Sequence, residues 1–448
     1  MMKILCFLNT RASAVNFIES GVVDHLNTVF NLSIAAPKDL EIFITKNVKS
    51  KSFFFKITDN YRYQYIFHYL CFKLKRARSP LYKVMKLQYP LPSMRVIYFT
   101  YHILFKTNKM DLSFLTKAKI KKYIKKIILY LISRKLLNWL FDRVILRVPE
   151  NFDLLEIIRK NHPDLVVVPT VGNNIYDCMV SQYCRELGIT TLFLAENWDN
   201  CVQNVLFWNK PNYLGTFSAQ STRYFIEYQD FLRDELIVTG SSRMNMYFEN
   251  HSKVLLPFRY VLFVGSEFSY NFDELIENVS RNLPADIKLV YRPYPRKKFE
   301  LPVKLKNLNN IIFDDGELFR YKNIKNSHDY LLCLLQNAIL VFGAPSTLIL
   351  ECAVLNKYFL MLTFDQFLAK DSPLAVFEYF PHYKGLEKIH YAIRCDNEES
   401  FIYEFSSKLN TPPKSINYFE NEALKDLLFQ NPDGYKNHLA NVIKDLIK

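Results

Sequence analysis

Polar side chains follow a stretch of sequence that has the composition of a buried β-strand. Residues 190–196 read TTLFLAE, and Glu196 is followed directly by Asn197, Trp198, Asp199 and Asn200. A general base for an acceptor hydroxyl can be a carboxylate placed at such a point. Glu196 and Asp199 are therefore candidates for that chemistry.

A third candidate base lies near the N-terminus. The segment LNTRASAVNFIESG (8–21) follows the first predicted strand, with Arg11 on the loop and Glu19 in the helix that comes next. Glu19 competes with Glu196 and Asp199 for the role of general base. The alternative, a solvated glutamate on a helix face, remains open.

Residues 341–353, VFGAPSTLILECA, have the types expected of a phosphate site. A strand ends at Gly343, and Ser346 and Thr347 open a helix whose free N–H groups and dipole attract anions. Glu351 follows about one turn later, where it can accept a ribose hydroxyl. An ordinary helix cap with a solvated glutamate is the competing interpretation.

Two further strand ends could contribute to the same site. In VYRPYP (290–295), Arg292 lies next to Pro293, so its guanidinium is presented rigidly to a phosphate or a carboxylate. The alternative is a structural salt bridge. In FVGSEFS (263–269), Gly265 and Ser266 can approach a diphosphate, although the G-x-G-x-x-G pattern is missing.

Other chemistries find little support in the sequence. FDDG (313–316) is explained by a turn after a short strand. The sequence contains no D-x-D, H-E-x-x-H or Cys/His cluster, so we expect no bound metal and no cofactor. No G-x-S-x-G elbow occurs either.

A basic amphipathic helix is predicted within the first third of the chain. Ile120, Ile124, Ile127, Ile128 and Leu131 share one face, and the opposite face carries Lys119, Lys121, Lys122, Lys125 and Lys126. Such a helix is suited to anionic lipid headgroups, with about 1 kcal/mol of attraction per lysine. Nucleic acid and a merely solvated face are the alternatives, and we expect no nucleic-acid partner.

Apolar strands that alternate with helices must position these residues. Strands are predicted at 3–10, 41–45, 53–57, 164–170, 190–196, 213–218 and 235–242, and a helix is predicted over 14–30. Further strands are predicted at 259–267, 288–295, 310–315, 338–347 and 358–365. Near-continuous apolar strands of this kind indicate parallel sheets covered on both faces, and ligands bind beyond the carboxyl ends of their strands.

Length and composition indicate more than one domain. The chain has 448 residues, of which 50% are hydrophobic and 23% charged, with a net charge of +14. Residues 1–150 hold 27 Lys and Arg against 8 Asp and Glu, whereas the remainder holds 31 against 36, which favours a local anionic partner. We predict an α/β fold: a first doubly wound domain at 1–240 with a basic helical insertion at about 60–147, a linker at 241–257, and a second doubly wound domain at 258–448. No secretory signal or membrane-spanning run is evident, so a cytoplasmic location is expected.

The order of several motifs resembles the GT-B-type glycosyltransferases of bacterial surface-polysaccharide synthesis. This loose group includes the CDP-glycerol glycerophosphotransferases and the capsule Kdo transferases. The motifs are TRASAVNFIESGVVDHL, PDLVVVPT, GITTLFLAENWDN, IVTGSSRMNMYF, LVYRPYP and VFGAPSTLILECAVLNKYFLML. Tyr294 stands where the group often has His, and the resemblance leaves out about 50–150.

The resemblance implies a metal-independent glycosyltransferase with two Rossmann-like domains that face a cleft. The acceptor, a glycan or glycolipid, would lie near Arg11, Glu19 and the residues Asn197, Trp198 and Asn200. The nucleotide-sugar donor would be held by Gly265, Ser266, Arg292, Ser346, Thr347 and Glu351. The basic helix would keep the enzyme at the inner membrane. A glycerophosphotransferase or a UDP-sugar epimerase on the same fold, or an inactive membrane-associated scaffold, are the alternatives.

Overall fold

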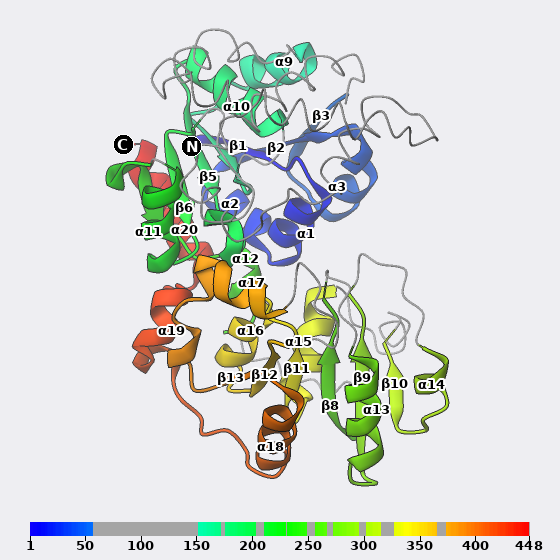
Figure 1. The fold of residues 1–448 in the computed structure, drawn as a ribbon. Coiled ribbons are helices and arrows are strands. Elements are labelled where there is room, and N and C mark those ends of the chain that lie inside the picture. The colour runs from blue at the N-terminus through cyan, green and yellow to red at the C-terminus, as the bar shows by residue number, and fades with distance from the viewer. Residues whose placement is uncertain are drawn as a thin grey trace, which may run out of the picture.

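The computed structural model describes residues 1–56, 151–171, 175–202, 210–229, 231–248, 256–266, 272–294, 302–314, 327–364 and 373–447. These residues form two parallel β-sheets with interleaved helices, and the two domains lie one above the other in Figure 1. The predicted α/β fold with two doubly wound domains is thereby confirmed. The predicted basic insertion at about 60–147 lies outside the described residues, as do its five lysines.

The first sheet has seven parallel strands in the order β3-β2-β1-β4-β5-β6-β7. Side chains alternate between its faces, so Leu5 and Phe7 enter one hydrophobic cluster while Ile4 and Cys6 enter another. Both faces are therefore buried, which explains why these strands are apolar throughout. The strands are β1 (Lys3–Phe7), β2 (Asn31–Pro37), β3 (Lys51–Phe55), β4 (Leu165–Val168), β5 (Thr190–Leu194), β6 (Tyr213–Thr216) and β7 (Leu236–Val238).

The helices of the first domain correct two predictions. The predicted helix at 14–30 is two helices, because Gly21 adopts a left-handed conformation with φ 73° between them. The strand predicted at 41–45 is wrong: this segment is helical, with Ile44 buried and Ile42 exposed. Of its three β-branched residues, Ile42, Ile44 and Thr45, only Ile44 is buried. The helices are α1 (Arg11–Glu19), α2 (Val22–Val29), α3 (Glu41–Asn47), α9 (Phe152–Asn161), α10 (Ile175–Glu186), α11 (Ala219–Gln229) and α12 (Ser242–Asn245), with 3-10 turns η1 (Lys38–Leu40), η4 (Trp198–Cys201) and η5 (Arg233–Glu235).

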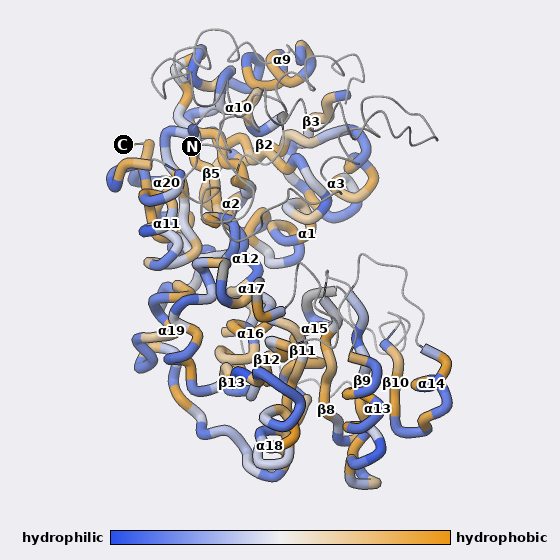
Figure 2. The backbone as a smooth tube through the Cα atoms, viewed as in Figure 1, coloured by the Kyte–Doolittle hydropathy of each residue, from blue (hydrophilic) through white to orange (hydrophobic). Residues whose placement is uncertain are grey.

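The second sheet has six parallel strands in the order β10-β9-β8-β11-β12-β13. Figure 2 shows hydrophobic residues along the strands of both sheets and hydrophilic segments on the surrounding helices. The strands are β8 (Arg259–Val264), β9 (Ile287–Arg292), β10 (Ile311–Phe313), β11 (Val341–Gly343), β12 (Phe359–Leu362) and β13 (Ala392–Cys395). The helices are α13 (Asp273–Asn282), α14 (Val303–Lys306), α15 (Ser327–Asn337), α16 (Leu348–Val354), α17 (Pro373–Tyr379), α18 (Glu398–Leu409) and α19 (Glu422–Leu427), with 3-10 turns η7 (Pro381–Tyr383), η8 (Leu386–Lys388) and η9 (Tyr418–Glu420).

The last helix of the chain, α20 (Tyr435–Ile447), returns to the first domain. Tyr435, Leu439 and Ile443 are buried in the hydrophobic cluster that contains Ile4 and Cys6 of β1. Both termini consequently lie at the first domain in Figure 1. The predicted second domain ran to residue 448, whereas the packing of α20 assigns the end of the chain to the first domain.

Candidate functional site

The carboxyl ends of the two sheets face each other. Arg243, in α12 directly after β7, forms an ion pair with Glu351, in α16 after β11. Glu19 in α1 interacts electrostatically with Asp329 in the first turn of α15, which starts at the carboxyl edge of the second sheet. Because all of these helices adjoin carboxyl ends of strands, the junction between the domains is where this fold displays functional residues.

Arg292 and the turn after β11 lie at the same level of the second sheet. Val264 of β8 pairs with Arg292 on one side and with Gly343 on the other. The backbones of Arg292 and Gly343 are therefore separated by two strand spacings, or about 10 Å. Gly265 follows in β8's exit, where an added Cβ would lie 3.0 Å from the backbone nitrogen of Tyr294. A side chain at Gly265 would push these two strand exits apart.

The guanidinium of Arg292 is held in place by two neighbours. Its Nη1 donates to Oδ2 of Asp314 over 2.5 Å, and its Cζ lies 5.3 Å from the ring centre of Tyr330. Asp314 is buried, and the Arg292 side chain is 18% exposed. The structural salt bridge that the sequence left open is thus present. It uses one of five N–H donors of the guanidinium, so Arg292 retains capacity for an anion.

Two hydroxyls stand at the start of α16. The Oγ of Ser346 is buried and forms no hydrogen bond with the residues that the structure describes, although buried polar groups are normally paired. Thr347 is the N-cap residue, but its side chain makes no capping bond. Within the described part of the chain, the Ser346 hydroxyl is therefore uncommitted, as the predicted phosphate contact requires. Ser266, the other predicted hydroxyl, is half-buried directly after Gly265.

Glu351 is fully buried and both of its oxygens are engaged. Oε1 pairs with Arg243, and Oε2 accepts a hydrogen bond of 2.9 Å from Tyr247. The nearby negative charge of Glu351 adds to burial in raising the pKa of Tyr247. These contacts favour a role in joining α12 to α16, and the contact with a ribose hydroxyl stays a prediction.

Glu19 has the properties of a general base near neutral pH. Its Oε2 is buried without a hydrogen-bond partner. Burial, followed by the negative charge of Asp329, raises the pKa of Glu19 to about 7. Helix α1 begins with a capping box, in which Thr10 Oγ1 accepts from the backbone nitrogen of Ser13 over 3.1 Å. Arg11, its first residue, is exposed.

The carboxylate of Glu196 is surrounded by donors from the protein itself. Oε2 accepts from the backbone nitrogen and the hydroxyl of Ser242, and Oε1 accepts from Tyr435 over 3.0 Å. Burial raises the pKa of Glu196, and these hydrogen bonds oppose the rise. Because Tyr435 belongs to α20, Glu196 fastens the last helix to the first domain. This geometry favours a structural carboxylate over the predicted base.

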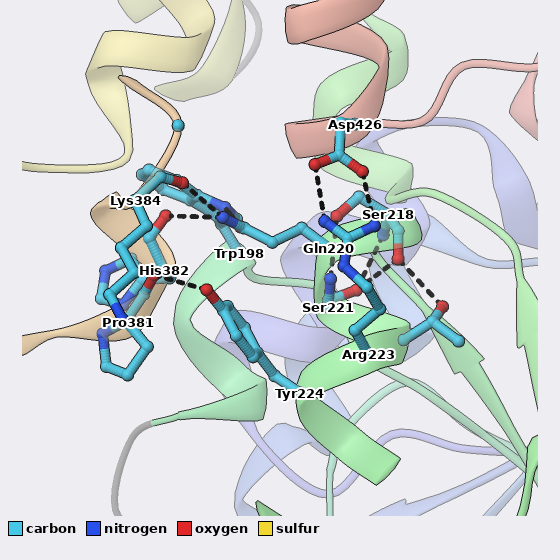
Figure 3. A network of polar contacts seen from close by, with 12 residues as sticks. Trp198, Ser218, Gln220, Ser221, Arg223, Tyr224, Pro381, His382, Lys384 and Asp426 are labelled. Atoms are coloured by element: carbon cyan, nitrogen blue, oxygen red, sulfur yellow. Dashed lines mark hydrogen bonds and ion pairs between the residues drawn. The ribbon is translucent and has the colours of Figure 1, made fainter. Parts of the chain in front are cut away.

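Trp198 contacts the second domain, as Figure 3 shows. Its Nε1 donates to Gln220 over 2.9 Å, and Gln220 donates in turn to the carbonyl of Lys384 over 2.7 Å. The indole packs edge-on against His382 and Tyr383 at centroid distances of 4.8 and 5.5 Å. Trp198 is fully buried by these contacts, which gives it a place between the domains and not on an acceptor surface.

The remaining residues of this cluster are half-buried. Asn200 Oδ1 accepts from the backbone nitrogen of Asn197 over 2.9 Å and closes the turn that begins η4. Asp199 adds a negative charge near Arg243 and Tyr383, and it helps to raise the pKa of Tyr383. Of the two carboxylates in the cluster, Asp199 is therefore the one that remains a candidate at the junction.

Several polar residues at these edges were not predicted as site residues. Asp314 was assigned to a turn, and Arg243 was noticed only as part of the junction motif. Asn9, Thr170 and Asp177 form a buried cluster after β1 and β4. A single aspartate amid the apolar residues of IYDCMV was the available signal for this cluster.

Within the ranges that the structure describes, no three His, Cys, Asp or Glu residues are grouped so that they could hold a metal ion. The helices of those ranges include none with the length and hydropathy needed to cross a membrane.

Comparisons with known proteins identify the fold. No family model matches the chain, and no curated protein is significantly similar to it. The structure is similar to UDP-GlcNAc 2-epimerase from Methanocaldococcus jannaschii, with 13% identity, 99% of each chain covered and a TM-score of 0.53. It is also similar to UDP-GlcNAc 2-epimerase from Neisseria meningitidis bound to UDP-GlcNAc, with 12% identity, 100% of each chain covered and a TM-score of 0.51. These likenesses show a two-domain architecture of the GT-B type.

Proposed function

We propose that the protein is an enzyme that uses a nucleotide-activated sugar at the junction of its two domains, and that it transfers the sugar to an acceptor hydroxyl. One observation carries the proposal: buried oxygens of Glu19 and Ser346, on opposite sides of this junction, have no hydrogen-bond partner among the residues that the structure describes. Leaving such groups unpaired costs free energy, about 1–3 kcal/mol each. A bound substrate that supplies the missing partners accounts for their retention.

The residues divide the reaction between the domains. Arg292 offers positive charge and N–H donors to the diphosphate, and Ser346 and Thr347 offer hydroxyls. Glu19 accepts the proton of the acceptor hydroxyl while that oxygen bonds to the anomeric carbon. The bond from this carbon to the diphosphate breaks, and the nucleotide leaves with its electron pair. Asp199 is the second candidate base, on the evidence of its half-buried position near Arg243.

The acceptor and the membrane belong to the proposal as well. A glycan or a glycolipid is the acceptor that the resemblance implies, and the anionic inner face of a membrane is where such a lipid lies. The lysines proposed to bind that surface, Lys119 to Lys126, are outside the described residues, so this step depends on the sequence alone.

A UDP-sugar epimerase is the second candidate. It is favoured by the similarity in fold to two UDP-GlcNAc 2-epimerases, one of them bound to UDP-GlcNAc. Inversion of a sugar carbon by removal and return of a proton exchanges the hydrogen on that carbon with solvent. Glu19 and Asp329 are the carboxylates at the junction that such a proton transfer would use.

A single experiment separates these outcomes. UDP-GlcNAc is incubated with the protein in D2O, with and without a purified cell-surface glycolipid extract, and the products are followed by NMR and mass spectrometry. Release of UDP that depends on the extract, with transfer of the sugar mass to a lipid, supports a transferase. Deuterium in the sugar ring without the extract supports an epimerase. An inactive scaffold gives neither product.

Binding provides an independent test. Thermal unfolding is measured with CMP-, CDP-, UDP- and GDP-linked compounds, and a ligand bound only by the folded state raises the melting temperature. Ser346→Ala is expected to reduce that rise, while Ser406→Ala, at an exposed serine of α18, should leave it unchanged. If no compound in the panel raises the melting temperature, the nucleotide site is refuted.

A further inference from the structure

A buried aspartate lies beside the point where the strand order of the first sheet reverses. β1 lies between β2 and β4. The chain continues from β1 to β2 on one side, and from β4 to β5 on the other side, so the strand order reverses between β1 and β4. Asn9 follows β1, Thr170 follows β4, and both donate hydrogen bonds to Asp177 of α10. In open α/β sheets, ligands bind beyond the carboxyl ends of strands at such a reversal.

The Asp177 carboxylate fixes the orientation of the Asn9 amide. Asp177 is fully buried, its Oδ1 accepts from Nδ2 of Asn9, and its Oδ2 accepts from Thr170 Oγ1 over 2.8 Å. Rotating the amide by half a turn would place the carbonyl oxygen of Asn9 against a carboxylate oxygen, which repels it. The amide group is planar, so Oδ1 of Asn9 points away from Asp177.

That oxygen is left without a partner. Asn9 is 5% exposed, and its Oδ1 is buried with no hydrogen bond to any residue in the described ranges. A carbonyl oxygen accepts hydrogen bonds only, so the group that fits it is a hydroxyl or an amide N–H. The Asp177 oxygens next to the amide are hydrogen-bond acceptors, so they disfavour a phosphate at this place. The chemistry therefore suits the neutral, hydroxylated part of a substrate.

We propose that Asn9 binds the sugar of the nucleotide-sugar, accepting a hydrogen bond from one of its hydroxyl or amide groups, and that Asp177 holds it in the accepting orientation. The inference rests on the proposed function, in which the second domain binds the diphosphate. A sugar that extends from there across the junction reaches the carboxyl edge of the first sheet. Asn9 then selects for the sugar without contributing to binding of the nucleotide.

Calorimetric titration with UDP-GlcNAc and with UDP tests this assignment on the full chain. Asn9→Ala is expected to weaken binding of UDP-GlcNAc by about 3- to 10-fold, the worth of one hydrogen bond, and to leave binding of UDP unchanged. Thr170→Val is the matched control, because it removes a donor from the same carboxylate but spares the Asn9 oxygen. It should keep the affinity for UDP-GlcNAc within about 2-fold of wild type.

The outcomes separate this inference from the function on which it rests. Binding of neither ligand to the wild-type protein overturns the proposed function and this inference together. The role of Asn9 is overturned, and the proposed function is not, if UDP binds but Asn9→Ala leaves the affinity for UDP-GlcNAc unchanged. The same holds if Thr170→Val weakens the affinity for UDP-GlcNAc as much as Asn9→Ala does. Gln336→Ala removes another buried, unpaired amide oxygen, at the far end of α15 from Asp329, and should affect neither affinity. Melting temperatures of all variants identify any loss caused by misfolding.

Discussion

The two parts of the domain junction differ in whether their buried polar groups are hydrogen-bonded. After β5, β6 and β7, the residues are paired across the domains: Glu196 with α20, Gln220 with Lys384, and Arg243 with Glu351. After β1 and β11, buried oxygens of Asn9, Glu19 and Ser346 are unpaired. His382 Nδ1 is an exception in the first part. We call the first part the fastened side and the second part the open side.

This contrast indicates where the substrate binds. A buried polar group that pairs within the protein stabilises the fold, whereas one kept unpaired destabilises it unless a ligand completes it. The fastened side therefore sets how the two domains are held together, and the open side is available for chemistry. Mutations on the open side should change activity more than stability, and those on the fastened side should do the reverse.

The largest effect is expected for Glu19→Gln. Loss of the general base should reduce kcat/KM for sugar transfer by at least about 100-fold. In the wild type, activity should rise with pH through about 7, because Glu19 must lose its proton to act as a base. That inflection should vanish in Glu19→Gln. Initial rates of UDP release from pH 5 to 9 measure both, and Asp24→Asn, an exposed carboxylate of α2, is the control.

The same substitution has a consequence for stability. The pKa of Glu19 is about 7 in the folded state and near its ordinary value of 4.5 in the unfolded state, so the folded protein binds more protons between these values. Stability contributed by this group is present below about 4.5 and is lost as the pH rises to about 7. The free energy of unfolding in urea should differ less between pH 5 and pH 8 in Glu19→Gln than in the wild type. An unaltered pH effect would count against the burial of this carboxylate.

The next effect belongs to the fastened side. Tyr435→Phe removes the donor of Glu196 Oε1 and should lower the free energy of unfolding by about 2 kcal/mol, since the partner is a buried carboxylate. Tyr403→Phe, at a tyrosine that is 72% exposed, should change it by less than about 0.5 kcal/mol. Urea denaturation measures both. Equal effects of the two substitutions would show that Glu196 does not depend on α20.

Gln220→Ala should have a somewhat smaller effect. It leaves Trp198 Nε1 and the Lys384 carbonyl without their partner, at a cost of about 1–2 kcal/mol in unfolding free energy. Because both groups lie on the fastened side, the affinity for UDP-GlcNAc should stay close to that of wild type. Calorimetry and urea denaturation together test the separation of the two sides. If Gln220→Ala lost binding of UDP-GlcNAc without losing stability, Gln220 would belong to the binding site and not to the contacts that hold the domains together.

The fold was predictable from the sequence to a greater extent than the site. Apolar strands such as LVVV at 165–168 are buried on both faces whatever their partners are, so local composition is sufficient to find them. Arg292 and Ser346 were singled out because each follows such a strand, and their roles stay predictions. The position of Trp198 between the domains depends on its contact with His382 and on the hydrogen bond from Gln220 to Lys384. Gln220 and Lys384 are 164 positions apart, so no local sequence pattern contains both residues.

The return of α20 was missed for the same reason. Tyr435, Leu439 and Ile443 form an ordinary amphipathic pattern, which shows that one face is buried but not in which domain. Glu196 was consequently interpreted as a catalytic carboxylate, because the donor that pairs with its Oε1 is on this helix, 239 positions away. Asn9 was overlooked because an asparagine at a strand end is commonplace, and only its pairing with Asp177 distinguishes it.

The smallest effect is expected for the ion pair at the rim of the fastened side. Arg223 donates to both oxygens of Asp426 at 2.8 and 2.6 Å, but the two side chains are 59% and 41% exposed. Solvent screening limits such a pair to a coupling of about 0.5–1 kcal/mol, which a double-mutant cycle with Arg223→Ala and Asp426→Ala measures. Salt at 1 M should abolish most of it. Because the buried contacts of Trp198 and Glu351 already hold the domains, the loss of this pair should leave activity unchanged. A coupling well above 1 kcal/mol that persists in salt would place the main fastening at the rim instead of around Trp198.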